Sequence, residues 1–261
     1  MKRRGFLQTL GLVCAGGATV SGAEKTSKKV LITSAECDLA PVLSAQLRRE
    51  HDVHLTGSVD IQRGDPFSRS ALGHDESTTA LVREVDTIVH VAEPPPGSSD
   101  AQKIGYRTRC TYNLLQAATA EGVRRVVYLS SLTTMLGYDD DFEVTEVWRP
   151  LATSDPDVLS HHLGEFTCRE FAHERRLEVV VLRLGKVVRE DAVKGKPFDP
   201  LWVEERDVAQ AVSLAVHAEL KEPGRPLWNV LHIQSASPRS RFTNRAANGV
   251  LGYKPQFRLG G

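Results

Sequence analysis

The sequence predicts a doubly wound α/β fold, in which helices cover both faces of a parallel sheet. Short apolar runs alternate with helical patterns along the chain, and the runs are continuously apolar instead of alternating with polar residues. The composition agrees, because 261 residues with 41% hydrophobic and 25% charged residues suit one globular domain with a substantial core. The same numbers exclude disordered, collagen-like and disulfide-scaffold chains.

The predicted strands are short β-branched or aliphatic runs. The first reads KVLITSA and the fourth, VDTIVHVA, is stopped by Glu93 and three prolines. A third, weaker run ends in Gly64-Asp65. We therefore expect strands over residues 29–35, 51–56, 61–65, 85–92, 126–131, 177–184 and 228–233.

The predicted helices show apolar residues at helical spacing. The first repeats Leu39, Val42, Leu43 and Leu47, and the strongest is amphipathic around residues 114–118. We expect helices over residues 39–50, 106–121, 161–176, 207–218 and 244–251, and one more that closes over 81–85. In a parallel sheet of this kind, ligands bind beyond the carboxyl ends of the strands, so the residues there are the ones to examine.

Residues 1–23 have the features of an export signal. A basic start with Arg3-Arg4 leads into a mildly apolar run and then into the small residues Ser21-Gly22-Ala23. The pattern resembles the bacterial twin-arginine signal, and the run is too short to span a bilayer stably. We expect an exported, periplasmic or extracytoplasmic protein whose mature chain is 24–261 and mildly acidic, without a stable membrane span. The alternative is a generic basic N-terminus.

Charge and cysteine usage exclude several classes of site. Lys+Arg and Asp+Glu are both 33, so no basic excess indicates a nucleic-acid partner. The mature chain has three cysteines, Cys37, Cys110 and Cys168, with no CxxC pair, which excludes a zinc ribbon and a complete disulfide framework. His161 and His173 lie more than three helical turns apart, so we expect no metal site.

Several blocks, in order, resemble the extended short-chain dehydrogenase/reductases of the NAD-dependent epimerase/dehydratase family. They are 30–40, Gly64-Asp65, His90-Val91-Ala92, TYNLLQAA at 111–118, GVRRVV at 122–127, Ser130-Ser131, Gly164-Glu165, 181–183, 205–209 and 251–255. The last blocks are similar to the uronate dehydrogenase branch. The resemblance implies a Rossmann-like domain that binds NAD or NADP and acts by hydride transfer on a sugar, sugar acid or sugar nucleotide.

The resemblance also implies a set of cofactor-binding residues. They are Thr33, Ser34, Ala35, Cys37, Asp38, Leu39, Asp65, Ala92 and Ser130. Ser34, Cys37 and Ala40 stand where the family's turn has three glycines, and a side chain at Cys37 would lean into the path of the pyrophosphate. Cys37 is either a reactive thiol or a small buried residue. Thr56-Gly57-Ser58 replaces the acidic residue that holds the ribose, so the choice between NAD and NADP stays open.

The family's Tyr-x-x-x-Lys pair is missing. Asp157 falls at the tyrosine position and His161 at the lysine position, and residues 139–185 contain neither Tyr nor Lys. An Asp-x-x-x-His pair is one candidate for proton transfer, because histidine titrates near neutral pH. The alternative is an ordinary exposed helix face. Ser131 is the third candidate catalytic residue, with a strand-end cap as its alternative.

Two functions follow from this pattern. One is an NAD(P)-dependent oxidoreductase or epimerase with His161, Asp157 and Ser131 as non-standard acid/base residues. The other is a catalytically inactive family member that serves as an exported ligand-binding or scaffolding protein.

We expect a reduced substrate lobe over about 186–261, where Arg239 and Arg241 either face an anionic ligand or lie in a solvated loop. The resemblance also implies a homodimer through the helices at 106–121 and 161–176.

Overall fold

A seven-stranded parallel sheet forms the centre of the computed structural model, which describes residues 27–61, 64–220, 226–237 and 240–259. The strand order is β3-β2-β1-β4-β5-β6-β9, so the order reverses between β1 and β4. Every pair in this sheet is parallel. The predicted doubly wound fold is confirmed. The expected signal at residues 1–23 lies outside the described residues.

The strands match the predicted apolar runs at six of seven places. They are β1 (Lys29–Ile32), β2 (Asp52–Gly57), β3 (Phe67–Arg69), β4 (Thr87–His90), β5 (Arg125–Ser131), β6 (Glu178–Leu184) and β9 (Trp228–Ile233). The third prediction is wrong, because β3 begins two residues beyond 61–65. Gly64, Asp65 and Pro66 lead into the strand, and the Pro66 carbonyl accepts the first cross-strand hydrogen bond from the Leu55 amide at 2.8 Å.

The first helix starts at residue 39 as predicted, whereas those expected at 106, 161 and 207 start earlier. The helices are α1 (Leu39–Leu47), α2 (Glu76–Val82), α3 (Asp100–Gly105), a π-helical turn (Tyr106–Cys110), α4 (Thr111–Ala120), α5 (Pro156–His173), α7 (Glu205–His217) and α8 (Arg245–Leu251). Ser99 and Gln102 form a capping box that starts α3, and the Asp155 side chain caps α5. The predicted starts at 106 and 161 are wrong because these polar caps precede the apolar residues.

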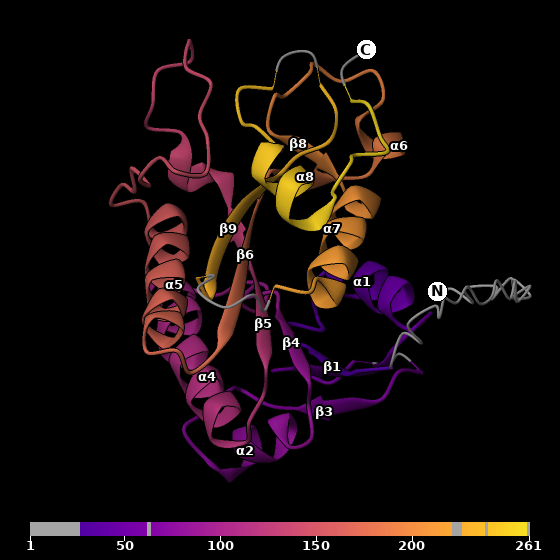
Figure 1. Ribbon diagram of the computed structural model, residues 1–261, viewed down its shortest axis with the longest axis vertical. Helices are drawn as coiled ribbons and strands as arrows, with labels where there is room; N and C mark the ends of the chain where they lie inside the picture. The colour runs from indigo at the N-terminus through magenta and orange to yellow at the C-terminus, as the bar shows by residue number, and fades with distance from the viewer. Residues whose placement is uncertain (1–26, 62–63, 221–225, 238–239, 260–261) are drawn as a thin grey trace, which may run out of the picture.

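Helices cover both faces of the sheet (Figure 1), and a hydrophobic core lies between the helices and the sheet on each side. One lies under α1, α7 and α8 and contains Leu43, Val212 and Leu251. The other lies under α2, α4 and α5 and contains Leu115 and Phe171. Burial on both faces explains why the strand sequences are continuously apolar.

A small second sheet extends the carboxyl end of β6. It pairs β7 (Lys186–Val188) with β8 (Trp202–Glu204) in parallel, with the short helix α6 (Glu190–Val193) between them. Gly185 allows the turn into this sheet, since a Cβ there would lie 2.1 Å from the Leu201 carbonyl oxygen. These three elements were not predicted. Within the residues that the structure describes, no helix is long and apolar enough to cross a membrane.

Candidate functional site

A cavity of about 920 Å³ lies along the carboxyl edge of the sheet. Its walls come from the turn after β1, the segment after β4, the end of β5, the start of α5 and the β6–β7 connection. This is the edge at which doubly wound folds bind ligands, and the volume lies within the range of about 300–1,000 Å³ typical of small-molecule sites.

The turn after β1 keeps a glycine-like backbone at Ser34, whose φ is +56°. Its Oγ lies 3.0 Å from the Tyr106 hydroxyl in the buried interior. Serine at this position therefore directs its side chain into the core and not toward the cavity. A positive φ costs a non-glycine residue about 1–2 kcal/mol, which the surrounding packing must offset.

Cys37 lines the cavity but packs largely against the core beside α1. Burial, the largest cause, raises the pKa of its thiol to about 11, and this outweighs the neighbouring helix amides, which lower it. The thiol therefore stays protonated at neutral pH, which favours the small buried residue over the reactive thiol. Asp38 is exposed at the start of α1 and lines the cavity with Leu39.

Four of the predicted cofactor residues line the cavity: Cys37, Asp38, Leu39 and Ser130. Ser34 and Ala35 lie buried behind the turn. Thr33 Oγ1 bonds His90 Nδ1 at 2.8 Å, and the Ala92 carbonyl accepts from Arg107 Nε at 3.1 Å.

Asp65 lies away from the cavity. It precedes β3, at the opposite end of that strand from the carboxyl edge, and it pairs with Arg48 at 2.8 Å. As a cofactor-binding residue, Asp65 was expected at the carboxyl end of a strand over 61–65. The position of β3 removes that basis.

Ser131 ends β5 at the cavity wall. Its Oγ accepts hydrogen bonds from the Thr133 amide at 3.1 Å and the Thr133 hydroxyl at 2.9 Å, so it does cap the strand end. Both contacts use Oγ as an acceptor, and its own proton remains available to a ligand. Ser130 instead donates to Glu165 at 2.6 Å, within a buried pair of Glu165 and Arg183.

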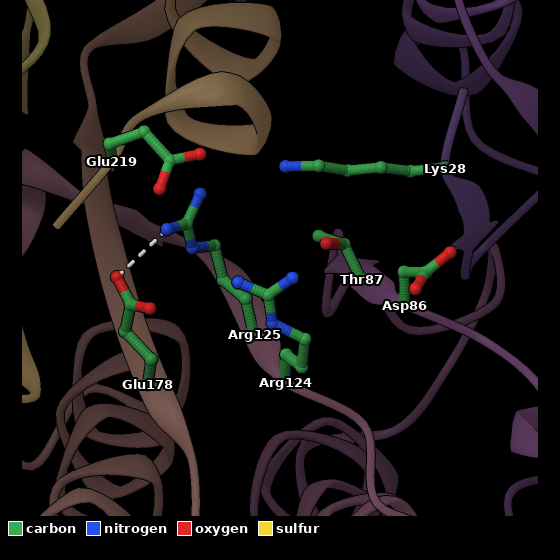
Figure 2. A pocket seen from close by; sticks show the side chains of 7 residues that line it. All are labelled: Lys28, Asp86, Thr87, Arg124, Arg125, Glu178 and Glu219. Carbon is green, nitrogen blue, oxygen red and sulfur yellow. Dashed lines mark hydrogen bonds and ion pairs between the residues drawn. The ribbon is translucent and has the colours of Figure 1, made fainter. Parts of the chain in front are cut away.

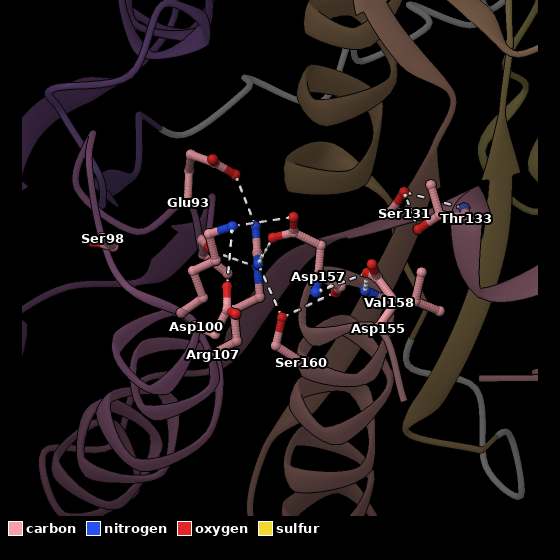
Figure 3. Close-up of polar contacts among 12 residues, drawn as sticks. Glu93, Ser98, Asp100, Arg107, Ser131, Thr133, Asp155, Asp157, Val158 and Ser160 are labelled. Carbon is pink, nitrogen blue, oxygen red and sulfur yellow. Dashed lines mark hydrogen bonds and ion pairs between the residues drawn. The ribbon is translucent and has the colours of Figure 1, made fainter. Parts of the chain in front are cut away.

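Asp157 and His161 do not form the predicted proton-sharing pair. Asp157 pairs with Lys103 of α3 at 3.2 Å and with Arg107 of the π-helical turn that follows at 3.6 Å. Arg107 is only 3% exposed and also contacts Glu93 and Ser160, each at 3.0 Å (Figure 3). The carboxylate at the tyrosine position is therefore held by cations from a neighbouring helix.

His161 lines the cavity while its Nδ1 is buried without a hydrogen-bond partner among the described residues. Burial lowers the pKa of this histidine to about 3, with a smaller contribution from the Arg107 charge. His161 is therefore neutral at neutral pH and can accept a hydrogen bond from a ligand or donate one, depending on its tautomer.

Sequence reasoning missed Glu36, Glu93, Lys103 and Arg107. Glu36 and Glu93 line the cavity, and Lys103 and Arg107 hold Asp157. One signal was present, because Lys103 and Arg107 are four residues apart and so share one helix face.

One of the two predicted arginines, Arg241, is engaged by protein groups. Arg241 pairs with Asp140 and donates to the carbonyls of Tyr138 and Asp139, so it fixes a loop. Arg239 lies outside the described residues. Among the residues that are described, no group of three or more His, Cys, Asp or Glu side chains could hold a metal ion.

A nicotinamide dinucleotide fits the cavity. The space is large enough, the turn keeps its backbone course at Ser34, and the amino terminus of the nine-residue helix α1 faces the region where a pyrophosphate binds in this fold. Glu36 Oε2 and His161 Nδ1 are buried polar atoms without partners in the described structure, as expected of groups that a ligand satisfies.

Comparison with known proteins identifies a family. The model of the "NAD dependent epimerase/dehydratase family" matches residues 42–201. No curated protein matches the sequence.

Solved structures of the same fold include three with informative names. Uronate dehydrogenase from Agrobacterium tumefaciens is 22% identical, with a TM-score of 0.72 over 89% of this chain and 86% of that one. Glucuronic acid dehydrogenase from Chromohalobacter salexigens is 22% identical, with a TM-score of 0.72 over 88% and 85%. UDP-N-acetylglucosamine 4-epimerase from Bacillus cereus is 15% identical, with a TM-score of 0.71 over 88% and 94%.

Proposed function

Because the chain belongs to the NAD-dependent epimerase/dehydratase family, we propose that it binds a nicotinamide dinucleotide at the carboxyl edge of its sheet and acts as an oxidoreductase or epimerase on a sugar-type substrate. One observation carries the proposal. The altered turn after β1, Ser131 and His161 all line the same cavity. A dinucleotide on the turn after β1 and a substrate beside Ser131 and His161 would therefore share this cavity.

The residues of the turn and α1 would hold the dinucleotide. The α1 amino terminus favours the pyrophosphate electrostatically, while the exposed Asp38 opposes it. When bound, the nicotinamide ring supplies the hydride acceptor or donor. A sugar, sugar acid or sugar nucleotide is supported as substrate by the uronate dehydrogenase and sugar-nucleotide epimerase among the structures of the same fold.

His161 and Ser131 take the proton-handling role in this proposal. Neutral His161 can accept the proton of a substrate hydroxyl, and the Ser131 hydroxyl can donate a hydrogen bond to the same oxygen. A ligand that brings water or negative charge to His161 would raise its pKa toward the working range, because burial is the main cause of the lowered value.

The first test is cofactor content. The protein is purified natively and denatured, released dinucleotide is measured by mass spectrometry, and the emptied protein is titrated with NAD and NADP by calorimetry. We expect a near-stoichiometric dinucleotide or a measurable affinity. Absence of both at millimolar concentration would reject the proposal.

Turnover is tested next with a panel of sugars, uronic acids and sugar nucleotides. His161→Ala should lower kcat by about 100-fold or more, since positioned acid–base groups contribute about 10²–10⁴-fold, while dinucleotide affinity stays the same. His162→Ala, on the next residue of the same helix, is the matched control. Equal turnover by the wild type and His161→Ala would remove His161 from the mechanism.

A second function, ligand binding without catalysis, is favoured by one observation. Asp157 stands at the tyrosine position and is paired with Lys103 and Arg107, so no phenol is available there. In that case the wild type binds dinucleotide without turnover, and Asp157→Tyr/His161→Lys gains turnover. Turnover in the wild type that the double variant abolishes would reject the second function.

Export and dimerisation are also part of the proposal. The twin-arginine-like residues 1–23 support export, which cell fractionation with and without Arg3→Lys/Arg4→Lys would test.

Tyr112 on α4 and Phe166 on α5 are 47% and 49% exposed, which supports a dimer through these helices. Phe166→Glu should shift a dimer to a monomer in light scattering, and a wild-type monomer would reject this part.

A further inference from the structure

The carboxyl end of β2 lacks an acidic residue of its own. The strand ends at Gly57 and is followed by Ser58. In doubly wound dinucleotide-binding folds, an Asp or Glu near this point accepts hydrogen bonds from the adenosine ribose, and a nearby arginine instead accommodates a 2′-phosphate. From the local sequence alone, neither cofactor is selected.

Glu36 brings a carboxylate to this place from another element. It lies in the turn after β1, and its Oε1 accepts hydrogen bonds from the Ser58 amide at 3.1 Å and the Ser58 hydroxyl at 2.8 Å. These two contacts fix the carboxylate against the end of β2. Glu36 also lines the large cavity, so its carboxylate borders the space that a ligand would fill.

The carboxylate occupies the volume of the missing side chain at position 57. A Cβ built on Gly57 would lie 2.1 Å from Glu36 Oε2 and 3.2 Å from Glu36 Cδ. A side chain at residue 57 and the observed position of Glu36 therefore exclude each other. Glu36 Oε2 is buried there with no hydrogen-bond donor among the described residues, so it has acceptor capacity that a rotation of the carboxylate would bring to a ligand in the cavity.

Among the described residues, one cation, Arg69, contacts the backbone just after β2, and it is already engaged. Arg69, at the end of β3, donates from Nε to the Ser58 carbonyl at 2.9 Å and pairs with Asp60 at 3.4 Å. It is less available to a phosphate than an unpaired arginine would be. Of the described charges here, Glu36 and Asp60 outweigh Arg69, which opposes a 2′-phosphate and tolerates a neutral ribose diol.

We propose that Glu36 is the ribose-recognition residue of this chain and makes its cofactor site selective for NAD over NADP. The inference rests on the proposed dinucleotide binding. The carboxylate accepts hydrogen bonds from the ribose hydroxyls, after a rotation of its terminal group, and repels a 2′-phosphate. In this chain the carboxylate comes from the turn after β1 and not from the end of β2, and the missing side chain of Gly57 leaves space for it.

The test is calorimetric titration of the purified protein with NAD and with NADP separately. We expect NAD to bind at least about 10-fold more tightly, since a hydrogen bond to a charged group is worth about that factor or more. Glu36→Gln keeps the shape and an oxygen that can bond Ser58 but removes the charge. It should weaken NAD binding and strengthen NADP binding, so that the preference falls by about 10-fold.

A double variant that moves the carboxylate from residue 36 to residue 57 tests whether the carboxylate itself sets the preference for NAD. Glu36→Ala should lose the preference, and Glu36→Ala/Gly57→Asp should regain it, because the carboxylate returns to the same space from β2. Asp52→Asn, at the exposed start of the same strand, is the control for removal of one negative charge and should leave the preference unchanged. Thermal melts establish that each variant is folded.

The outcomes are distinct. No binding of either dinucleotide to the wild type overturns the proposed function and this inference with it. Binding of both with equal affinity, or an unchanged preference in folded Glu36→Gln, overturns the inference and leaves the proposed function standing. Loss of preference in Glu36→Ala with recovery in the double variant supports both.

Discussion

The two ends of the central sheet carry similar polar side chains in opposite arrangements. At the amino end, a terminal nitrogen of Arg125 bonds Glu178 at 3.0 Å (Figure 2). The terminal nitrogens of Arg125 also donate to the carbonyls of Ala215, Val216 and Ala218. The space left there is about 10 Å³, room for about one water molecule. At the carboxyl end, a cavity of about 920 Å³ is bordered by Glu36 and His161, each with a buried atom that lacks a partner.

The difference teaches how to separate structural polar groups from ligand-binding ones in this molecule. At the amino end the terminal nitrogens of Arg125 are satisfied by protein groups, although its Nε has no partner in the described structure, and removing one member of the ion pair leaves the other buried and unpaired. Polar atoms that border an open cavity without partners cost stability in the empty protein and gain partners when a ligand binds. The two ends should therefore respond differently to substitution.

The largest expected effect is at the amino end. Arg125→Met should lower the free energy of unfolding by about 3–5 kcal/mol, because it leaves Glu178 buried and unpaired. Arg125→Met/Glu178→Leu should recover most of that loss, since both charges are then absent. Urea denaturation measures both. A single variant as stable as the wild type would show that this network does not stabilise the fold.

Acid sensitivity comes from buried neutral histidines. Burial, with smaller effects of neighbouring arginines, lowers the pKa of His90, His161 and His232 to about 3. Histidine in an unfolded chain titrates near 6.5, so between about pH 6.5 and 3 only the unfolded chain takes up these protons. The free energy of unfolding therefore falls as the pH falls through this window.

His232→Leu tests this directly. Neither ring nitrogen of His232 has a partner in the described structure, and Arg183 beside it disfavours its protonation further. The variant should avoid about 2 kcal/mol of the stability lost between pH 7.5 and pH 5. Denaturation at both pH values gives the difference. An unchanged pH dependence would mean that His232 does not titrate as its burial implies.

The sequence predicted the sheet well because strands buried on both faces must be continuously apolar. It missed β7 and β8, and misplaced β3, because each has only three residues and shows no period. The order of the family pattern placed Ser131 and His161 at the carboxyl edge, and both line the cavity. It could not find Glu36 or the cations around Asp157, because those contacts join residues 22, 50 and 54 positions apart.

A smaller effect is expected at the Asp157 pair. Lys103→Gln should lower the free energy of unfolding by less than about 1 kcal/mol, because both side chains are partly exposed to water. The contrast with Arg125 sharpens the comparison of the two ends. Chemical denaturation at low and high salt checks it. A loss as large as that of Arg125→Met would place Lys103 in a closed structural network.

An effect of similar size is expected at Asp38. This residue is exposed at the N-cap of α1 but makes no capping hydrogen bond through its side chain, so its charge is its main contribution. Asp38→Asn should cost about 0.3–1 kcal/mol of stability, since a negative charge at a helix amino terminus is favourable. The same change should tighten dinucleotide binding by about 2–5-fold, because it removes a negative charge beside the pyrophosphate, and that repulsion is of the same order, about 0.3–1 kcal/mol.

Salt distinguishes this electrostatic effect from a change of shape. The gain in affinity should shrink between 0.05 and about 0.5 M salt, as screening of exposed charges requires. Asp52→Asn, an exposed acid at the opposite end of β2, should change neither affinity nor its salt dependence. If Asp38→Asn weakened binding instead, its carboxylate would be holding the turn in place, and the carboxyl edge would contain a structural group like those at the amino end.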